Sequence, residues 1–340
     1  MPEHRFLVVR LSSLGDIVHT FPAVAGLRES FPNAEIVWLT HSRWKLLVQS
    51  SSLAAEIWTT ETRSFASLRE SLRRIRAQAF ETAIDYQGLW KSAAISFLGG
   101  VPRRIGFSSE TIREYGVPIL YTDRVRTTQP HIADQNGELS QRAGARHATG
   151  AVKLSVPPEE ESEFLEQLRR LGVDRYVALS PGGGWRSKCW PPEHFGVLCK
   201  TIRDSLGLRC IINYGPGEES LAASVREASS NAAPILYNGE LGQLMALLRN
   251  TLCIVGGDTG PLHLAVALGT PSVALFGPTD PARNGPYRGN TGASSPIDII
   301  LRSSHAVTTY KRSGQFDSSM LEIEVAQVFE AVRRLVEART

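Results

Sequence analysis

The chain has 340 residues, of which 42% are hydrophobic and 21% charged, and its formal net charge is +3. That length favours two domains, and the composition is typical of a globular protein. The weak positive charge argues against a nucleic-acid partner, although it suits an anionic small molecule or a weak contact with an anionic membrane surface.

Neither a signal peptide nor a membrane-spanning helix is predicted. The N-terminal apolar run is short and has no small-residue cleavage site, and no apolar stretch approaches the roughly 18 residues that span a bilayer. We therefore expect a cytoplasmic protein whose membrane contact, if any, is peripheral. No CxxC pair occurs, so the cysteines are expected to be reduced thiols; they are Cys189, Cys199, Cys210 and Cys253.

In the first half, short apolar runs alternate with helical patterns, which is the order expected of a parallel sheet covered by helices. The predicted elements are, in chain order, a strand at Phe6–Val9, a turn at Ser12–Gly15, a helix from Asp16 to about Ser30, strands at Glu35–Leu39 and Thr82–Tyr86, and a helix at Lys91–Leu98.

The same rhythm restarts after a polar break at Val156–Glu161. A helix over Glu161–Gly172 is predicted to link the halves, and a last amphipathic helix runs from about Ser318 to Glu337. The predicted strands of the second half are Tyr176–Ser180, Leu208–Tyr214, Pro234–Tyr237, Leu252–Val255 and Ser272–Phe276. The fold class is therefore α/β, with two similar halves.

The first motif, Arg10-Leu-Ser-Ser-Leu-Gly-Asp16, follows the first strand. Loops at the carboxyl ends of parallel strands line ligand sites. Asp16 has two interpretations. From spacing alone we favour a helix-stabilising carboxylate at a helix N-terminus. The alternative is a general base for an acceptor hydroxyl, provided that burial raises its pKa.

The second motif, Ser180-Pro-Gly-Gly-Gly-Trp-Arg-Ser-Lys188, connects a strand to a helix that begins with proline. Successive glycines let backbone amides approach an anion, and Lys188 offers a compact positive charge. The spacing is neither that of a P-loop nor GxGxxG. A phosphate site and a plain flexible loop are equally compatible with these residues.

The third motif, Gly257-Asp258-Thr259-Gly260-Pro261 followed by His263, also lies between a strand and a helix. Free amides at such a helix start suit a pyrophosphate, and Asp258 can bind sugar hydroxyls. His263 alone is more simply a buried, hydrogen-bonded histidine. The later Gly277–Pro281 turn is predicted to be structural.

Glu219 follows another strand of the second half, where a carboxylate can accept hydrogen bonds from a ribose or simply start a helix. An arginine-rich stretch in the first half is by default a solvated helix face, and its functional interpretation is attraction of an anionic acceptor. Its members are Arg63, Arg69, Arg73, Arg74 and Arg76, with Lys91, Arg103, Arg104, Arg113 and His131 as possible extensions. No HExxH, paired cysteine or DxD spacing supports a metal, and no GxSxG supports a serine hydrolase.

Taken together, these motifs resemble the ADP-heptose:lipopolysaccharide heptosyltransferases of glycosyltransferase family 9. The resemblance covers nearly the whole chain in order, and the GDTGPLH and GPTDP forms look more like heptosyltransferase I than II. The segments on which the resemblance rests are RLSSLGDIVHTFPA, DYQGLWKSA at Asp85–Ala93, SKCWPPEHF, GGDTGPLHLAVALGTP and FGPTDP.

The resemblance implies a GT-B fold, in which two Rossmann-like domains with parallel sheets face an interdomain cleft. It implies an N-terminal acceptor domain over residues 1–157, a C-terminal nucleotide-sugar domain over 158–317, and a C-terminal helix within 318–340 that packs back toward the N-terminal domain. It also implies an inverting transfer of heptose from ADP-heptose to the Kdo of lipid A without a cofactor or essential metal, by a monomer at the cytoplasmic face of the inner membrane.

Site residues carry over position by position. Asp16 matches the family's catalytic base, and Lys188 matches a lysine that holds the leaving diphosphate. The implied donor residues are Gly183, Gly184, Lys188, Glu219, Gly239, Asp258, Thr259, Gly260 and His263, and the implied acceptor residues are Ser13, Gly15, Arg63, Lys91 and His131. Gly183 and Gly184 depart from the family, which carries hydroxyl residues there, so glycine amides would have to replace those contacts.

Three other functions remain open from the sequence. A heptosyltransferase II-like or III-like step, or another GT-B transferase, would use a different acceptor or donor. A sugar-nucleotide epimerase or a similar non-transferring enzyme would consume the donor without a lipid acceptor. A noncatalytic binding protein would keep the fold alone, although the retained Asp16 and Lys188 speak against it.

Overall fold

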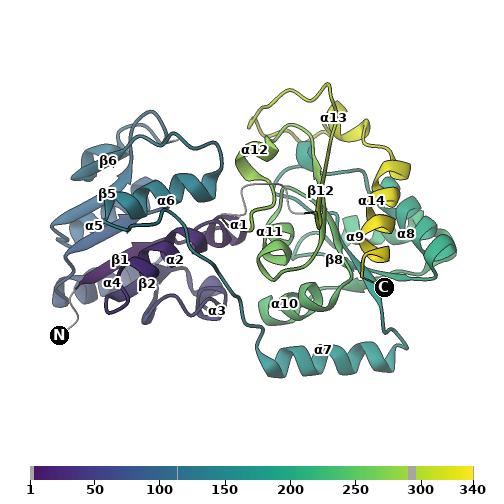
Figure 1. Ribbon diagram of the computed structural model, residues 1–340, viewed down its shortest axis with the longest axis horizontal. Helices are drawn as coiled ribbons and strands as arrows, with labels where there is room; N and C mark the ends of the chain where they lie inside the picture. Colours follow the sequence, from purple (N-terminus) through teal and green to yellow (C-terminus); the bar gives the residue numbers. More distant parts are fainter. Residues whose placement is uncertain (1–3, 113, 290–295, 340) are drawn as a thin grey trace. The chain divides into compact units, whose positions relative to one another are not determined.

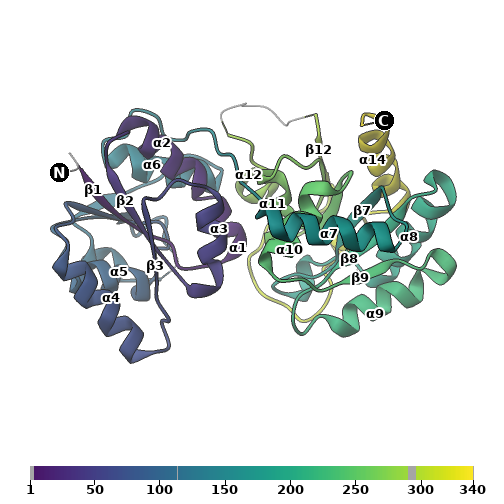
Figure 2. The same cartoon turned by 90° about the horizontal axis from the view of Figure 1, so that it is seen from below.

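The computed structural model describes residues 4–112, 114–289 and 296–339, and the chain divides into two compact units, Met1–Leu154 and Ser155–Thr340. Each unit contains a six-stranded parallel sheet covered by helices, as Figures 1 and 2 show. This confirms the predicted α/β class with two Rossmann-like sheets. The unit boundary falls three residues before the predicted domain boundary at 157/158.

The N-terminal sheet has the strand order β3-β2-β1-β4-β5-β6. Its strands are β1 (Arg5–Val9), β2 (Glu35–Thr40), β3 (Glu56–Thr59), β4 (Thr82–Asp85), β5 (Arg103–Phe107) and β6 (Asp123–Val125). Its helices are α1 (Leu14–Val18), α2 (Phe21–Ser30), α3 (Lys45–Ser50), α4 (Phe65–Ala77), α5 (Trp90–Leu98) and α6 (Ile132–Arg142), with the 3₁₀ turns η1 (Ser42–Trp44) and η2 (Val117–Leu120). Figure 2 shows α2 and α6 on one face of this sheet and α4 and α5 on the other.

The C-terminal sheet has the order β12-β11-β10-β7-β8-β9. Its strands are β7 (Tyr176–Ser180), β8 (Arg209–Asn213), β9 (Ile235–Tyr237), β10 (Ile254–Gly257), β11 (Ser272–Phe276) and β12 (Asp298–Arg302). Its helices are α7 (Pro158–Arg170), α8 (Pro192–Leu206), α9 (Glu219–Ala228), α10 (Leu241–Asn250), α11 (Gly260–Ala267), α12 (Pro281–Asn284), α13 (Ser318–Leu321) and α14 (Val325–Glu337), with the 3₁₀ turns η3 (Arg186–Lys188) and η4 (Ser230–Ala232).

Two predicted helices are each divided in the structure. The stretch from Asp16 to Ser30 forms α1 and α2, because Pro22 lacks an amide hydrogen and occupies the first turn of a new helix. The stretch from Ser318 to Glu337 forms α13 and α14, and Glu324 caps the second helix. Strands β3, β5, β6 and β12 were not predicted; β6 has only three residues and β5 begins with two arginines.

The C-terminal helix α14 covers part of the core of its own unit. Helix α14 belongs to the C-terminal unit, where it packs against α8 and β11. Its apolar face enters the core of that unit through Val328, Val332 and Leu335, which are at most 3% exposed. Packing there removes the helix's apolar surface from water, and that burial is the driving force for the placement.

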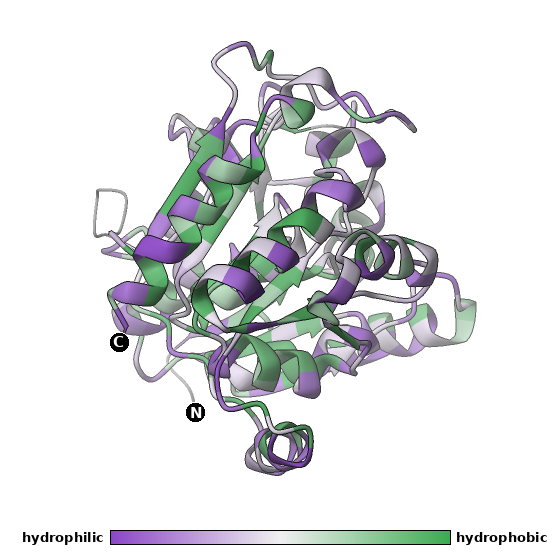
Figure 3. Cartoon of the chain, turned by 90° about the vertical axis from the view of Figure 1, so that its right-hand side faces the viewer, coloured by the Kyte–Doolittle hydropathy of each residue, from purple (hydrophilic) through white to green (hydrophobic). Residues whose placement is uncertain are grey.

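The two cores follow the expected division of strands and helices. Strand residues such as Leu7, Val9 and Leu39 form the N-terminal core, while Val177, Leu179 and Val255 contribute to the C-terminal one. Figure 3 shows mainly hydrophobic strands in the C-terminal unit and helices with alternating hydrophilic and hydrophobic bands. Sheets covered on both faces leave the strand ends as the accessible edges, where loops can build a site.

Candidate functional site

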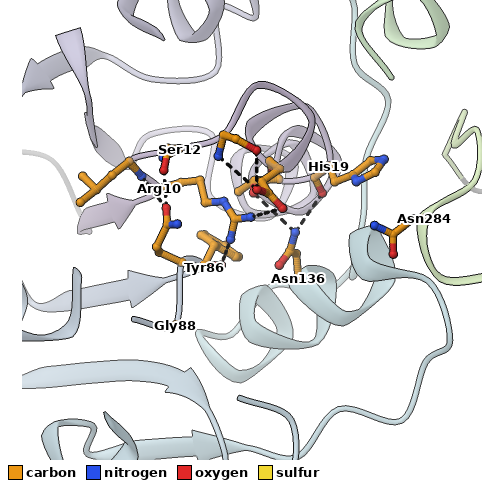
Figure 4. A network of polar contacts seen from close by, with 12 residues as sticks. Arg10, Ser12, His19, Tyr86, Gly88, Asn136 and Asn284 are labelled. Carbon is orange, nitrogen blue, oxygen red and sulfur yellow. Dashed lines mark hydrogen bonds and ion pairs between the residues drawn. The ribbon is translucent and has the colours of Figure 1, made fainter. Parts of the chain in front are cut away.

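The first candidate site lies where β1 ends and α1 begins (Figure 4). Asp16 occupies the first turn of α1, and its Oδ2 accepts hydrogen bonds from the Ser13 amide at 3.1 Å and the Ser13 hydroxyl at 2.7 Å. These contacts are those of a carboxylate that stabilises a helix N-terminus, which is the interpretation favoured from spacing. Gly15 is buried in the same turn, so Ser13 and Asp16 are the residues of this turn that solvent reaches most easily.

Arg10 is the partner that distinguishes Asp16 from an ordinary cap. Its guanidinium Nη2 lies 2.8 Å from Asp16 Oδ1, and Nη1 donates to the Tyr86 carbonyl oxygen. The Arg10 side chain is 6% exposed, whereas that of Asp16 is 46% exposed. The Asp16 carboxyl group is thus only half buried. The buried Arg10 guanidinium fixes the orientation of the Asp16 carboxylate through this ion pair, and the exposed side of the carboxylate stays open to a substrate hydroxyl.

The loop between β1 and α1 is held from a second strand. Gln87, just after β4, accepts hydrogen bonds through Oε1 from the amides of Leu11 at 2.9 Å and Ser12 at 3.1 Å. Asp85 in turn accepts from the Gln87 amide at 2.9 Å and the Tyr121 hydroxyl at 2.7 Å. The DYQG segment therefore positions the loop that carries Asp16, a role that sequence reasoning did not assign.

Asp85 is a buried carboxyl group surrounded by hydrogen-bond donors. The amides of Gln87 and Gly88 and the hydroxyls of Ser92 and Tyr121 all donate to it. Burial raises the pKa of the Asp85 carboxyl, and these hydrogen bonds offset only part of that rise. Its position beneath the loop indicates a supporting role.

His131 caps α6 and lies near the first site rather than on an exposed surface. It is 9% exposed, its Nδ1 accepts from the Ala133 amide at 3.1 Å, and its ring meets that of His19 edge-on at 5.3 Å. Asn136 on the same helix donates to the His19 carbonyl oxygen at 3.0 Å (Figure 4). These contacts tie α6 to the segment after α1.

The second candidate site joins the ends of the neighbouring strands β7 and β10. Lys188, in η3, donates to the Asp258 carbonyl oxygen, and its Nζ lies 3.7 Å from Asp258 Oδ2. Asp258 Oδ1 lies 3.1 Å from His263 Nε2 in α11. The three side chains are between 4% and 11% exposed. Lys188 and Asp258 are 70 positions apart in the chain, and the pairing of β7 with β10 brings them together.

The environment of Asp258 favours its charged form. Burial acts to raise its pKa, but the hydrogen bond from His263 and the positive charges of Lys188 and His263 outweigh burial, so the pKa lies below its usual range. The Lys188 ammonium also lies 4.4 Å from the centre of the Trp185 ring. Lys188 is therefore held in place by a carboxylate and an aromatic face before any ligand binds.

The glycine loop between β7 and η3 passes directly beside this cluster. A Cβ at Gly183 would lie 2.8 Å from Cys189 Sγ and 3.7 Å from Thr259 Cγ2, whereas a Cβ at Gly184 would meet nothing within 4 Å. Gly183 is thus required by close packing, and Gly184 is open. Two hydroxyls at this place, Ser187 Oγ and Thr259 Oγ1, are buried and make no hydrogen bond within the described chain, which marks them as candidate ligand contacts.

Thr259 and Gly260 begin α11 directly after β10. The first amides of α11 have no acceptor within the helix, as at every helix start, and such amides suit an anion; Pro261 in the first turn lacks an amide hydrogen. Gly239 lies between β9 and α10, where a Cβ would come within 2.7 Å of the Tyr237 ring. The predicted donor residues Lys188, Asp258, Thr259, Gly260 and His263 therefore form one cluster, with Gly183 alongside.

The carboxylates of the adjacent residues Glu218 and Glu219 have different surroundings. Glu219 is exposed and its Oε1 accepts from the Gly217 amide at 3.1 Å. Glu218 instead accepts from the Gly215 amide at 2.8 Å, and its carboxylate occupies the space where a Cβ of Gly182 would lie. The carboxylate that faces the glycine loop is thus that of Glu218, which sequence reasoning missed because two adjacent glutamates cannot be distinguished by pattern.

Most of the predicted basic surface is engaged in local contacts. Arg73 pairs with Glu70, Arg74 stacks on Trp58 and Arg76 donates to the Leu98 carbonyl oxygen. Arg63, Arg69 and Lys91 are at least partly exposed. Arg103 pairs with Asp123, and Arg104 donates to the carbonyl oxygens of Val101 and Leu120. Arg113 lies outside the described residues.

Metal-ligand clusters and long apolar helices are both absent from the described ranges 4–112, 114–289 and 296–339. Within them, no three histidine, cysteine or acidic side chains gather as metal ligands, and no helix has the length and apolarity that a bilayer crossing requires. The four cysteines are buried thiols without disulfide bonds.

Comparisons with known proteins agree with one another. Residues 68–305 match the model of glycosyltransferase family 9 (heptosyltransferase). Lipopolysaccharide heptosyltransferase 1 of Escherichia coli K12 is 27% identical over 302 residues, covering 84% of this chain and 92% of that protein.

Solved structures show the same fold. A family 9 glycosyltransferase of Veillonella parvula superposes with a TM-score of 0.84 at 21% identity, covering 99% of this chain and 98% of the other. The E. coli ADP-heptose lipopolysaccharide heptosyltransferase II gives a TM-score of 0.81 at 21% identity, covering 98% and 99%. These likenesses confirm the predicted GT-B fold.

Proposed function

We propose a specific reaction for this chain, which belongs to glycosyltransferase family 9, the heptosyltransferases. The reaction is the inverting transfer of heptose from ADP-heptose to a Kdo hydroxyl of the lipopolysaccharide inner core, the step of a heptosyltransferase I. The relatives named above support the substrate classes, since their names specify ADP-heptose and lipopolysaccharide. The observation that carries the proposal is the buried Lys188–Asp258–His263 cluster beside the glycine loop.

The donor's diphosphate is proposed to bind at that cluster. The Lys188 ammonium and the amides at the start of α11 would face the diphosphate, and Thr259 Oγ1 and Ser187 Oγ would donate to it. Asp258 would hold Lys188 and accept hydrogen bonds from sugar hydroxyls. When the bond between the anomeric carbon and the phosphate oxygen breaks, ADP leaves with the electron pair. The fixed positive charge then stabilises the growing negative charge on the diphosphate.

Asp16 is proposed as the general base. As the acceptor oxygen bonds to the anomeric carbon, the hydroxyl proton passes to the Asp16 carboxylate. Two features support this role: Asp16 is half exposed in the first turn of α1, and its carboxylate is oriented by an ion pair with Arg10. Ser13 and Gly15 would shape the acceptor's approach, and Arg63, Lys91 and His131 are proposed to bind acidic groups of the acceptor.

The remaining features of the proposal concern conditions and location. We propose that transfer needs no metal or cofactor, because Lys188 and helix amides supply the positive charge that a metal would otherwise provide. We also propose that the protein acts as a monomer at the cytoplasmic face of the inner membrane. Activity that survives EDTA and a monomeric mass in solution are the expected results.

The decisive experiment is a turnover assay with purified protein, ADP-heptose and Kdo₂-lipid A, which measures ADP release and product mass. Release of ADP together with one added heptose is expected. Transfer only to an already heptosylated core would instead assign a later step. Inhibition by UDP rather than ADP would indicate a different donor, and donor consumption without an acceptor would indicate a non-transferring enzyme.

A further inference from the structure

Helix α5 has an unusual distribution of apolar residues. Its inner face is buried through Ser92, Ala93, Ile95 and Ser96, as expected of a helix that covers a sheet. Its outer face is apolar as well: Trp90, Phe97 and Leu98 are each 45–47% exposed. An outward face of a helix on a parallel sheet is normally polar. This face therefore needs a partner outside the unit or a reason to remain in water.

The exposed residues in and just before η2 extend this apolar face. Tyr115 is 96% exposed and Ile119 is 71% exposed. The Trp90 ring lies against Gly116, and the Trp90 amide donates to Glu114 Oε2 at 2.7 Å. At the other end, the Arg104 guanidinium lies 5.3 Å from the centre of the Phe97 ring and donates to the Leu120 carbonyl oxygen. Because α5 and η2 contact each other, these exposed side chains lie on two adjoining segments, called here the α5–η2 surface: Trp90, Phe97, Leu98, Tyr115 and Ile119.

The charges around the α5–η2 surface are mainly positive. Lys91 is exposed beside Trp90, and exposed Arg76 donates to the Leu98 carbonyl oxygen at 2.9 Å. Arg104 is the third cation. A neighbouring acid is Glu114, whose carboxylate accepts a hydrogen bond from the first helical amide of α5, where the helix dipole compensates negative charge. An apolar centre with a cationic border complements an anionic partner that also offers apolar atoms.

We propose that the α5–η2 surface docks on an anionic phospholipid bilayer. Trp and Tyr rings favour the headgroup region, and the Phe, Leu and Ile side chains can enter the acyl boundary beneath it. Lys91, Arg76 and Arg104 would lie at the level of the phosphates, where each cation adds attraction that salt weakens. The helix lies on the bilayer rather than crossing it. The inference deepens the proposed membrane location, and it does not depend on the transfer reaction.

Vesicle flotation without any substrate tests the proposal. The full chain is expected to float with vesicles of phosphatidylglycerol and phosphatidylethanolamine, less with phosphatidylcholine alone, and less as salt is raised. The double variant Phe97→Gln/Leu98→Gln is expected to lower the partition coefficient by about tenfold or more, because two side chains lose their apolar contact with lipid. The proposal would be overturned if the wild-type protein did not float with anionic vesicles, or if the double variant bound them as well as wild type.

A matched pair of single variants controls for loss of an exposed leucine. Leu98 is 47% exposed and Leu171, at the end of α7, is 50% exposed. Leu98→Gln should weaken vesicle binding by about threefold, and Leu171→Gln should leave it unchanged; equal effects would refute the assignment of this surface. If the double variant fails to fold, Ile119→Gln repeats the comparison.

Two further readouts distinguish bilayer docking from a role in catalysis and from self-association. With a short, acyl-free acceptor, Phe97→Gln/Leu98→Gln should keep the wild-type kcat/KM, because neither Phe97 nor Leu98 is among the residues proposed to bind donor or acceptor. If wild type shows no transfer but keeps the vesicle pattern, the proposed reaction fails and the docking surface stands. If wild type self-associates through this surface and the double variant is monomeric with unchanged flotation, the partner is a second copy and the lipid proposal is wrong.

Discussion

Asp16 in the N-terminal unit and Asp258 in the C-terminal unit occupy similar positions in the chain. Each follows a central strand, stands at the beginning of a helix and contacts a cation. They differ in burial: the Asp16 side chain is 46% exposed, and that of Asp258 is 8% exposed and contacts two basic residues. The comparison teaches that an accessible carboxylate can exchange a proton with a substrate, whereas an enclosed one fixes the position of its cations.

The largest expected effect is on turnover by Asp16→Asn. Removing a general base should lower kcat by about 10²–10⁴-fold, while ADP affinity stays close to wild type because the change lies in the other unit from the proposed donor site. Steady-state kinetics and calorimetric ADP binding measure the two quantities.

Asp134 provides a matched control, because it holds the same first-turn position in α6. Asp134→Asn should keep turnover near wild type. If Asp16→Asn retained most of its kcat, Asp16 would be only the helix-stabilising residue that its contacts with Ser13 also describe.

The second prediction concerns stability, for which Asp258 should matter more than Asp16. Asp258→Asn leaves the buried Lys188 ammonium without a carboxylate and should lower the free energy of unfolding by about 3 kcal/mol. Asp16→Asn should cost less than Asp258→Asn, since the Asp16 carboxylate is 46% exposed and water can reach the Arg10 guanidinium side of the pair through it, whereas Lys188 and Asp258 are both enclosed. Urea unfolding measures both.

The control for Asp258 is the exposed pair of Lys200 and Asp204 in α8. Asp204→Asn should change the unfolding free energy by less than about 0.5 kcal/mol. If both variants lowered the free energy of unfolding equally, burial would not explain the contribution of the Asp258 cluster to stability.

The third prediction concerns the glycine loop. Gly183→Ala places a Cβ 2.8 Å from Cys189 Sγ and should destabilise the protein by about 1–3 kcal/mol and weaken ADP binding. Gly184→Ala meets nothing within 4 Å and should fall within about 0.5 kcal/mol of wild type. Thermal unfolding and ADP titration of the two variants measure these effects. If Gly184→Ala lost more stability or ADP affinity than Gly183→Ala, the described packing of the loop would be wrong.

The smallest predicted effect is a dependence of stability on pH. The folded-state pKa of Asp258 lies below its unfolded value of about 3.9, so its contribution is fully present above that pH. The contribution is lost as pH falls through the folded pKa, at no more than about 1.4 kcal/mol per pH unit. Asp258→Asn should flatten the acid side of the stability curve, and an unchanged slope would show that Asp258 is not responsible.

Asp85 in the N-terminal unit should behave with the opposite sign. Burial raises its folded pKa above the unfolded value, so ionisation of Asp85 costs stability as pH rises between the two. Asp85→Asn should therefore remove a downward slope just above pH of about 4, even though its NH₂ group can no longer accept the hydrogen bonds that the Ser92 and Tyr121 hydroxyls donate to Oδ2. The slope, rather than the total stability, is the quantity to compare.

Much of the architecture could be predicted from periodicity. The continuous apolar runs, such as Tyr176–Ser180 and Ser272–Phe276, match β7 and β11 at both ends, because strands buried on both faces must be apolar throughout. Short or charged strands such as β6 and β5 carry no such signal, since their pairing partners rather than their own sequence stabilise them.

The candidate site was predictable in its residue types and only partly in its contacts. The sequence by itself placed Asp16, Lys188 and Asp258 after strands, since a strand followed by glycine and a helix start is a local pattern. Tertiary structure alone decided that Arg10 pairs with Asp16, that Gln87 holds the same loop, and that Glu218 rather than Glu219 faces the glycines. The reason is physical: these contacts join side chains across paired strands and neighbouring loops, and side-chain direction and burial at such junctions arise only when the sheet forms.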